Sequence, residues 1–415
     1  MQTEPELHDL LRQRVDAARG DAELEAALHG VPCGIRLSVP GALVEVHPGP
    51  DGLTLSASAQ DWSRVLQHQP PVGWHSFTAA RRSGALVADA DDLRIAQCLH
   101  ALERLFEILR GQHEGAREGD EGLDLGGITG RYRTLRVLGE RCTVHVESAG
   151  AGDAPLLVML HTAGADSRQF HAVMADPGLA ARWHMVAFDM PGHGRSQPPG
   201  DAWLGYRLDR ARYLEAVRAA LVAIGQGRKA VLMGCSMGAA MALHAARELP
   251  GLVHGAIALE APFRSPGRRT PMLAHAQVNQ AAHNPSYVRG LMGPASPLAR
   301  RRHAAWIYSQ GGFGMYAGDL AFYSDDFDAE RDVTGLDGRR IPVELLTGSY
   351  DESATPADSR RVAALVPGAR FGEMPELGHF PMTEHPRVFL GYLRPVLARI
   401  GARLHAAPDT TETTP

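Results

Sequence analysis

The sequence predicts an α/β fold, a mostly parallel sheet covered by helices on both faces, preceded by a small α+β unit. Three observations support this prediction. From about residue 131 to 403, short apolar runs alternate with segments of helical periodicity. Some runs, such as residues 156–160, are wholly apolar, which is typical of strands buried on both faces. The first 110 residues instead combine amphipathic helical segments with short alternating runs.

The N-terminal region, residues 1–110, is predicted to form an α+β unit of its own. Residues 4–29 carry apolar side chains at helical spacing, and residues 34–58 form alternating runs split by Pro-Gly turns, the pattern of hairpins. A continuous apolar stripe at residues 93–109 predicts a long closing helix. No catalytic group of residues stands out here. Two roles stay open: holding copies of the chain together as a homo-oligomer, or partly roofing a site in the second unit.

The second unit, residues 131–403, follows a Gly- and Glu-rich stretch at 111–130 that predicts a linker. It contains an insertion at about residues 261–338, and residues 404–415 are predicted to form a disordered tail. We expect its strands at residues 132–138, 142–147, 156–160, 185–188, 230–233, 253–259, 341–347 and 370–374, and its helices around 170–175, 207–224, 239–248, 358–365 and 386–400.

The composition narrows the class of protein. The 415 residues are 44% hydrophobic and 21% charged, with a net charge of −5, so no basic field favours nucleic acid. No apolar run approaches the roughly 20 residues of a membrane span, and the N-terminus lacks a signal-peptide core. The four cysteines are scattered, and no phosphate loop, dinucleotide fingerprint or metal-ligand spacing occurs. We therefore expect a cytoplasmic protein with no nucleic-acid partner, membrane attachment, metal or cofactor.

A glycine-flanked serine lies between a predicted strand and a predicted helix. Residues 234–238 read Gly-Cys-Ser-Met-Gly, which is G-x-S-x-G in the strand–turn–helix context that this motif requires. Glycines allow a sharp turn, so the Ser236 hydroxyl is expected at its tip above the helix N-terminus. The alternative is an ordinary helix N-cap serine. We interpret Ser236 as a candidate nucleophile.

Together with four further motifs, this turn resembles the α/β-hydrolase superfamily. The motifs are HTAG at 161–164, DMPGHGRS at 189–196, LLTGSYD at 345–351 and ELGHFPMTEHP at 376–386. The resemblance covers about residues 131–403 and is specific for the fold but much less so for the substrate. It implies that the insertion at 261–338 is a helical cap over the active site.

The resemblance also implies a role for each motif. A serine nucleophile needs a base within hydrogen-bond reach, and His379 is the candidate. The base needs a carboxylate, for which Asp351 holds the usual position. Some members of the superfamily place the acid after the sixth strand, which makes Glu260 the alternative.

An oxyanion hole is implied as well. The resemblance assigns its two backbone N–H donors to Met237, which follows the nucleophile, and to Ala163 in the loop after the third strand. Thr162 replaces the glycine that is commoner in this loop, so Gly164 is an alternative donor.

Aromatic side chains in the insertion indicate a hydrophobic or aromatic substrate. Trp306, Tyr308, Phe313 and Tyr316 are the candidates for substrate binding, and the alternative is that they form the core of the insertion itself. The run Arg300–Arg302 predicts either a carboxylate-binding site or, more simply, a solvated helix face.

These expectations combine into one leading function and two alternatives. The leading one is a serine hydrolase that cleaves a carboxylic ester, or a related amide or lactone, of a small hydrophobic or aromatic substrate through an acyl-enzyme on Ser236. The second is a C–C bond hydrolase of aromatic catabolism that uses the same three residues. The third is a ligand-binding protein that kept the fold and lost turnover.

Overall fold

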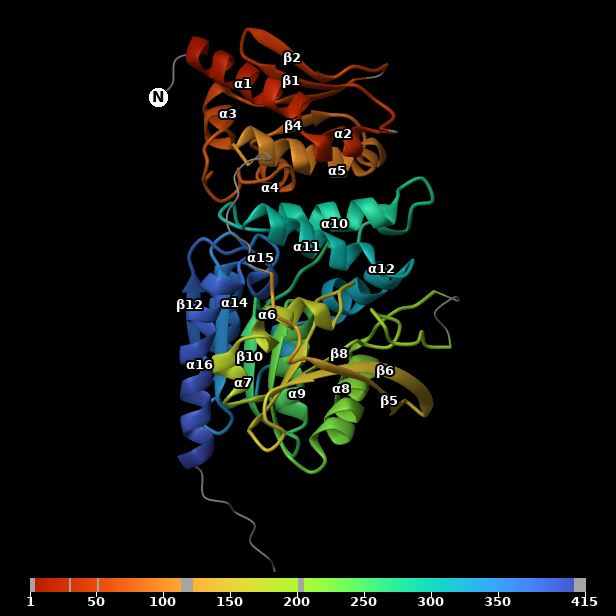
Figure 1. Cartoon of the computed structure of the whole chain (residues 1–415), viewed down its shortest axis with the longest axis vertical. Coiled ribbons are helices and arrows are strands. Elements are labelled where there is room, and N and C mark those ends of the chain that lie inside the picture. The colour runs from red at the N-terminus through yellow and green to blue at the C-terminus, as the bar shows by residue number, and fades with distance from the viewer. Residues whose placement is uncertain (1–3, 30, 51, 113–121, 201–204, 407–415) are drawn as a thin grey trace, which may run out of the picture.

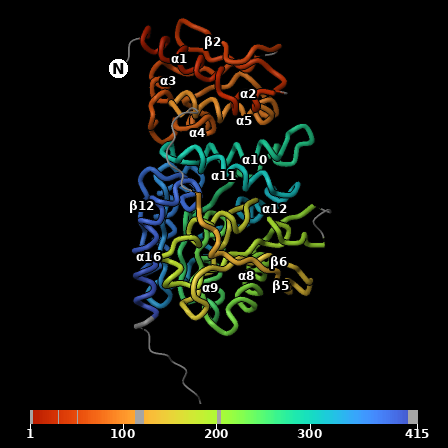
Figure 2. Tube along the Cα trace, in the orientation of Figure 1, coloured from red at the N-terminus to blue at the C-terminus, as the bar shows by residue number. Residues whose placement is uncertain are grey.

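The computed structural model describes residues 4–29, 31–50, 52–112, 122–200 and 205–406. It contains a four-stranded sheet near the N-terminus and an eight-stranded sheet in the remainder. The N-terminal unit lies at one end of the molecule, and helices α10 (Gln280–Gly290) and α11 (Leu298–Ser309) lie between it and the larger sheet (Figures 1 and 2). Parts of the predicted linker (113–121) and tail (407–415) fall outside the described residues.

The N-terminal sheet is mixed rather than built of hairpins alone. Strand β1 pairs with β2 antiparallel, as a hairpin, but pairs with β3 in parallel. Ile35, Leu37 and Val39 of β1 are buried and alternate with less buried residues, so one face of the sheet carries the core. The elements are α1 (Glu4–Arg19), α2 (Ala22–Leu28), β1 (Ile35–Val39), β2 (Ala42–His47), β3 (Leu53–Ser56), α3 (Ala59–Val65), α4 (Phe77–Arg82), β4 (Val87–Asp89) and α5 (Asp92–Leu109).

Helix α5 is buried on more than one side. Its predicted apolar stripe, which includes Leu102 and Phe106, belongs to the core of the N-terminal unit. Glu103, Arg104 and Glu107 are also buried, on a helix whose neighbour is α10 of the inserted segment (residues 261–338). The helix therefore joins the N-terminal core to the rest of the molecule.

The eight-stranded sheet has the order β12-β11-β10-β9-β7-β8-β6-β5. Pairing is parallel from β12 to β8 and antiparallel for β8–β6 and β6–β5. The strands are β5 (Thr129–Val137), β6 (Glu140–Ala149), β7 (Leu156–Leu160), β8 (His184–Phe188), β9 (Ala230–Cys235), β10 (Val253–Leu259), β11 (Val343–Gly348) and β12 (Arg370–Met374).

Helices cover both faces of this sheet, which confirms the predicted fold class. Side chains of β7 alternate between two cores: Leu156, Val158 and Leu160 enter one, and Leu157 and Met159 enter the other. The first core includes α8 (Arg210–Gly225), α9 (Met237–Glu248) and α14 (Pro356–Leu365), and the second includes α6 (His171–Met174), α7 (Pro177–Ala180) and α16 (Pro386–Ala406).

Several helix boundaries differ from the sequence-based ones, among them those of α14 and α16. Helix α14 begins at Pro356 because Thr355 and Asp358 form a capping box at its N-terminus. Helix α16 continues to Ala406, past the predicted start of the tail at residue 404.

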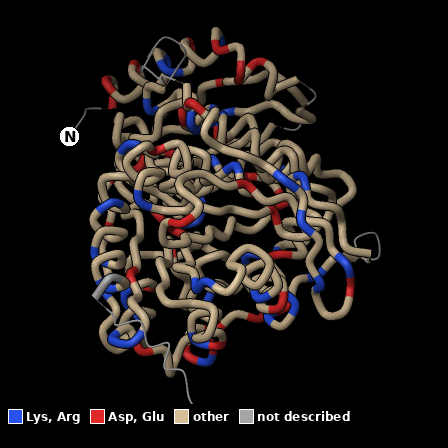
Figure 3. Tube along the Cα trace, turned by 60° about the horizontal axis from the view of Figure 1, so that its bottom comes forward, with Lys and Arg blue, Asp and Glu red and all other residues tan. Residues whose placement is uncertain are grey.

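The inserted segment is mostly helical. Besides α10 and α11, it contains η3 (Pro271–Ala274), α12 (Met315–Leu320), the π-helical turn η4 (Ala321–Asp326) and α13 (Ala329–Asp332). Outside the insertion, a short helical turn, η1 (Ser167–Phe170), precedes α6. Acidic and basic residues are interspersed along the trace (Figure 3). In the part of the chain that the structure describes, no helix is both long and apolar enough to cross a bilayer.

Candidate active site

Ser236 stands at the junction of β9 and α9 in a strained conformation. Its φ is 56°, a left-handed value that residues other than glycine seldom adopt. The flanking glycines make this turn possible, because a Cβ on Gly234 would lie 2.1 Å from the Gly238 carbonyl oxygen. A Cβ on Gly238 would lie 2.3 Å from the Leu160 carbonyl oxygen at the end of β7. Ser236 occupies the N-cap position of α9, but its side chain caps no helix amide, so it is not an ordinary capping serine.

His379 joins Ser236 to Asp351. Its Nε2 lies 2.8 Å from Ser236 Oγ, and its Nδ1 lies 2.7 Å from Asp351 Oδ2. All three side chains, called the triad below, are buried. The other carboxylate oxygen of Asp351 accepts hydrogen bonds from the Ser353 and Ala354 amides. With Asp351 ionised, Nδ1 carries the proton and Nε2 accepts from the serine hydroxyl.

Glu260, the alternative acid, lies behind Asp351 instead of on the imidazole. Its carboxyl oxygens accept from the Gly348 amide at 3.0 Å, and its side chain hydrogen-bonds Asp351. Burial, and then the charge of Asp351, raises the pKa of Glu260 well above its ordinary value. Burial alone would also raise the pKa of Asp351, but His379 and the donated hydrogen bonds hold it below its ordinary value. These opposite shifts favour a protonated Glu260 that donates to an ionised Asp351.

The histidine loop is tied to the inserted segment. The His379 amide donates to the carbonyl of Leu291, at the C-terminal end of α10, at 3.0 Å. Glu384 accepts from the Gly378 amide and, at 3.2 Å, from the Gly293 amide. Burial raises the pKa of Glu384 to about 8. The position of the imidazole thus depends on the end of α10.

The loop after β7 supplies one predicted oxyanion donor. Ala163 is buried there, and neither its amide nor that of Met237 has a protein acceptor among the described residues. The alternative donor, Gly164, already donates its amide to Asp319 Oδ2 at 2.8 Å, which argues against it. Thr162 is held by Gln169, whose Oε1 accepts from its amide and its hydroxyl.

The four aromatic candidates divide into two pairs. Tyr308 and Tyr316 are buried; the Tyr308 hydroxyl contacts Thr162 Oγ1, and the Tyr316 ring packs on Gly164. Trp306 and Phe313 are 47% and 72% exposed, so the prediction that they line the site is not supported.

Trp306 has partners of its own at the surface. Its ring stacks on His303 and lies under the Arg168 guanidinium, 4.6 Å from the ring centroid. These contacts hold the indole on the outward side of α11.

Two residues that were not among the predicted site candidates also lie beside the triad. Tyr323, in the π-helical turn, hydrogen-bonds Ser236, and its hydroxyl lies 3.3 Å from Ser353 Oγ. The guanidinium of Arg268 contacts the same Ser353 hydroxyl. The sequence offers no motif for either residue, because both reach the site from irregular parts of the insertion.

The arginine run does not form a solvated face throughout. Arg301 is buried and donates to Glu107 and to several backbone carbonyls, including that of Met292, and Arg302 pairs with Glu23. Both acids belong to the N-terminal unit, so these arginines hold the two parts of the molecule together.

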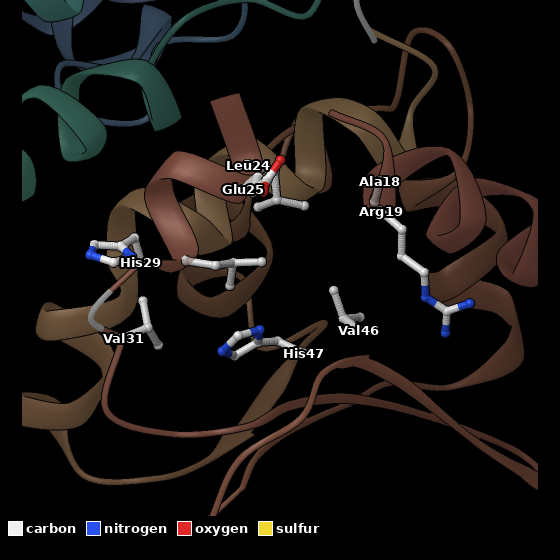
Figure 4. A pocket seen from close by; sticks show the side chains of 9 residues that line it. Ala18, Arg19, Leu24, Glu25, His29, Val31, Val46 and His47 are labelled. Carbon is white, nitrogen blue, oxygen red and sulfur yellow. The ribbon is translucent and has the colours of Figure 1, made fainter. Parts of the chain in front are cut away.

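Two cavities of similar volume lie in or beside the N-terminal unit. One, of about 470 Å³, lies within it between α1, α2 and β2, and it is lined by residues such as Arg19, His29 and His47 (Figure 4). The other, of about 500 Å³, lies between the N-terminal unit and the inserted segment and includes Arg268 and Tyr316. Within the described ranges, no group of His, Cys, Asp and Glu could hold a metal ion.

Comparison with known proteins gives matches at the levels of sequence and of structure. Residues 157–391 match the sequence model of a family described as the alpha/beta hydrolase family. The 2-(acetamidomethylene)succinate hydrolase of Mesorhizobium japonicum is 25% identical over 268 residues, which are 60% of this chain and 90% of that protein.

Among solved structures, a thermophilic esterase from Thermogutta terrifontis superposes with a TM-score of 0.56 at 18% identity, over 65% of this chain and 99% of that one. The enol-lactonase from Burkholderia xenovorans LB400 superposes with a TM-score of 0.55 at 20% identity, over 64% of this chain and 100% of that one. At these identities the structural likeness concerns the fold.

Proposed function

The chain belongs to the alpha/beta hydrolase family, and from this premise we propose that it is a serine hydrolase of carboxylic esters, or of a related amide or lactone. The observation that carries the proposal is the hydrogen-bonded chain from Ser236 Oγ through His379 to Asp351, with distances of 2.8 and 2.7 Å. A nucleophile, a base and an orienting carboxylate in this order are what acyl transfer through a serine requires.

In the first step, Ser236 Oγ attacks the substrate carbonyl while its proton passes to His379 Nε2. The imidazolium that forms is stabilised by Asp351, to which its Nδ1–H donates. Negative charge develops on the carbonyl oxygen, and the amides of Ala163 and Met237 are proposed to receive it. Collapse of this intermediate expels the alcohol, which takes the proton from Nε2, and leaves an acyl group on Ser236.

In the second step, His379 removes a proton from water, which attacks the acyl carbon. The carboxylic acid leaves and Ser236 regains its proton from the imidazolium, so the enzyme is restored. Burial of the triad supports this scheme, because hydrogen bonds and charges act more strongly where water is excluded.

Substitution of the nucleophile tests the proposal. Ser236→Ala is expected to lower kcat for para-nitrophenyl butyrate by about four to six orders of magnitude, with an unchanged circular dichroism spectrum. Ser56→Ala, in β3 of the N-terminal unit, is the matched control and is expected to keep wild-type kcat. Full turnover in Ser236→Ala would remove the proposal.

The remaining alternatives have separate tests. Because one relative is named a 2-(acetamidomethylene)succinate hydrolase, acetamides should be tested as substrates alongside esters. Turnover of ring-cleavage dienoates in place of esters would favour the C–C bond hydrolase. Failure of a fluorophosphonate probe to label Ser236 would favour a ligand-binding protein without turnover.

A further inference from the structure

We propose that the cavity between the N-terminal unit and the inserted segment, whose lining includes Arg268, binds a carboxylate-bearing part of the substrate. Arg268 is the residue that would pair with this carboxylate. The inference rests on the proposed function and deepens it, since it names the substrate class: a monoester or monoamide of a dicarboxylic acid. The cavity measures about 500 Å³, enough for a small molecule.

Arg268 carries a charge that no acid of the described chain neutralises through an ion pair. Its neighbours differ: Arg264 pairs with Asp328, and Arg269 pairs with Asp325 at 2.7 Å. Among the described residues, the Arg268 side chain contacts the Ser353 hydroxyl, hydrogen-bonds Tyr316 and lies over the Tyr287 ring, and its Nε is buried without a hydrogen-bond partner. A half-buried guanidinium with an unused donor is suited to bind a carboxylate through two parallel hydrogen bonds.

Arg268 is also connected to the nucleophile. The Ser353 hydroxyl that it contacts lies 3.3 Å from the Tyr323 hydroxyl, and Tyr323 hydrogen-bonds Ser236. The Ser353 amide donates to Asp351 at 2.7 Å. A carboxylate held at Arg268 therefore lies within the length of a small substrate from the reacting serine.

The N-terminal unit contributes a second cation to the same cavity. Arg82 of α4 donates to the Tyr287 hydroxyl at 2.7 Å, and the Arg268 guanidinium lies over the ring of Tyr287, 5.1 Å from its centroid. The third arginine of the lining, Arg81, is neutralised by Asp92 at 2.7 Å. Two guanidiniums from different parts of the chain thus flank one tyrosine, and the cavity has a positive excess.

Much of the remaining lining is apolar, beside the polar residues Thr78, Thr270 and His283. Phe77, Ile95 and Leu99 of the N-terminal unit face Leu273 of the inserted segment across the cavity. This wall suits the hydrocarbon part of a dicarboxylic acid. Of the two roles that the sequence left open for the N-terminal unit, its share in this cavity supports the roofing of the site.

The test is a ratio of two activities. We expect the wild-type protein to hydrolyse mono-para-nitrophenyl glutarate with a kcat/KM at least about tenfold above that for para-nitrophenyl pentanoate, which has the same chain length and no charge. Arg268→Gln should lower this ratio by about ten- to a hundredfold. Arg264→Gln, whose side chain is exposed and lies outside the cavity lining, should leave the ratio unchanged.

A wild-type enzyme without preference for the charged ester, or an Arg268→Gln variant that loses activity equally on both esters, would overturn the site. A binding measurement keeps this outcome apart from failure of the proposed function. Calorimetry with glutarate should show binding to Ser236→Ala and none to the double variant with Arg268→Gln. If glutarate binds in this way while neither ester is cleaved, the carboxylate site stands and the ester hydrolase does not.

Discussion

Two regions of this molecule bury several charged groups, and they treat charge differently. Where the N-terminal unit meets the inserted segment, Glu107 lies among three arginines: Arg289 at 3.0 Å, Arg104 at 3.0 Å and Arg301 at 3.3 Å. In the triad, Asp351 instead lies against a second acid, Glu260, whose pKa is raised by burial and then by the charge of Asp351.

The difference indicates what each region is for. Direct pairing makes the first region a structural joint, because removal of one partner leaves buried charge uncompensated. In the second region, Ser236 is strained, Arg268 has no ion-pair partner among the described residues, and the pKa of Glu260 is raised. These groups can therefore still form interactions with a bound molecule. Buried polar groups that are incompletely matched are the ones available to a substrate.

The largest effect is expected where the triad acid is made neutral. Asp351→Asn should lower kcat by about ten-thousandfold, because an amide favours the wrong tautomer of His379. Steady-state kinetics on a para-nitrophenyl ester checks this, with exposed Asp16→Asn as a control expected to match the wild type. Retention of more than about a tenth of the activity would show that the active region does not depend on this charge.

The next largest effect is expected on stability, from loss of the ion pairs where the N-terminal unit meets the inserted segment. Glu107→Gln should lower the free energy of unfolding by about 3 to 5 kcal/mol, since its guanidinium partners lose their counter-charge inside the protein. Urea denaturation measures it. Glu215→Gln removes a partly exposed partner of Arg218 near the surface and should cost less than about 1 kcal/mol. Equal losses in the two variants would contradict the distinction between the regions.

A pH effect of intermediate size is expected from Glu384. Its pKa is ordinarily 4.5 and is raised to about 8 by burial, so the folded state binds more protons than the unfolded state between these values. Stability should therefore fall as pH rises through this window and level off above it. Relative to Glu384→Gln, the wild type should lose roughly 2 to 3 kcal/mol between pH 5 and 7.5. Parallel stability curves for the two proteins would show that Glu384 is already ionised.

The smallest effect on kcat is expected for a substitution of Glu260, and it tests which acid belongs to the triad. If Glu260 is neutral and donates to Asp351, Glu260→Gln preserves that donor and should change kcat by less than about threefold. A loss as large as that expected for Asp351→Asn would make Glu260 the orienting acid. Comparison of the two variants on one substrate decides between them.

The sequence predicted the three residues of the triad, which the structure brings together, better than it predicted their surroundings. Ser236, His379 and Asp351 follow strands in motifs whose spacing is local, so their positions can be inferred without knowledge of packing. The residues of the inserted segment belong to no such local motif. Trp306 and Tyr308 are two residues apart on α11, yet one is exposed and the other buried, because packing against the loop after β7 selects the inward face.

Charges in the insertion were the hardest to interpret. Arg301 lies in a run of three arginines that looks solvated, and its burial depends on Glu107, which is 194 residues away. Arg268 has no motif at all. Its importance comes from the absence of an acid partner in the described chain, a property that only the folded arrangement reveals.

The proposed mechanism requires a covalent acyl intermediate on Ser236, and peptide mass spectrometry of rapidly quenched protein tests this most directly. The protein is mixed with a para-nitrophenyl ester, quenched in acid within milliseconds and digested to locate the adduct. We predict a mass increase equal to the acyl group on the peptide that contains Ser236, and none in Ser236→Ala. An unmodified peptide during rapid turnover, or an adduct that survives the Ser236→Ala substitution, would contradict the account.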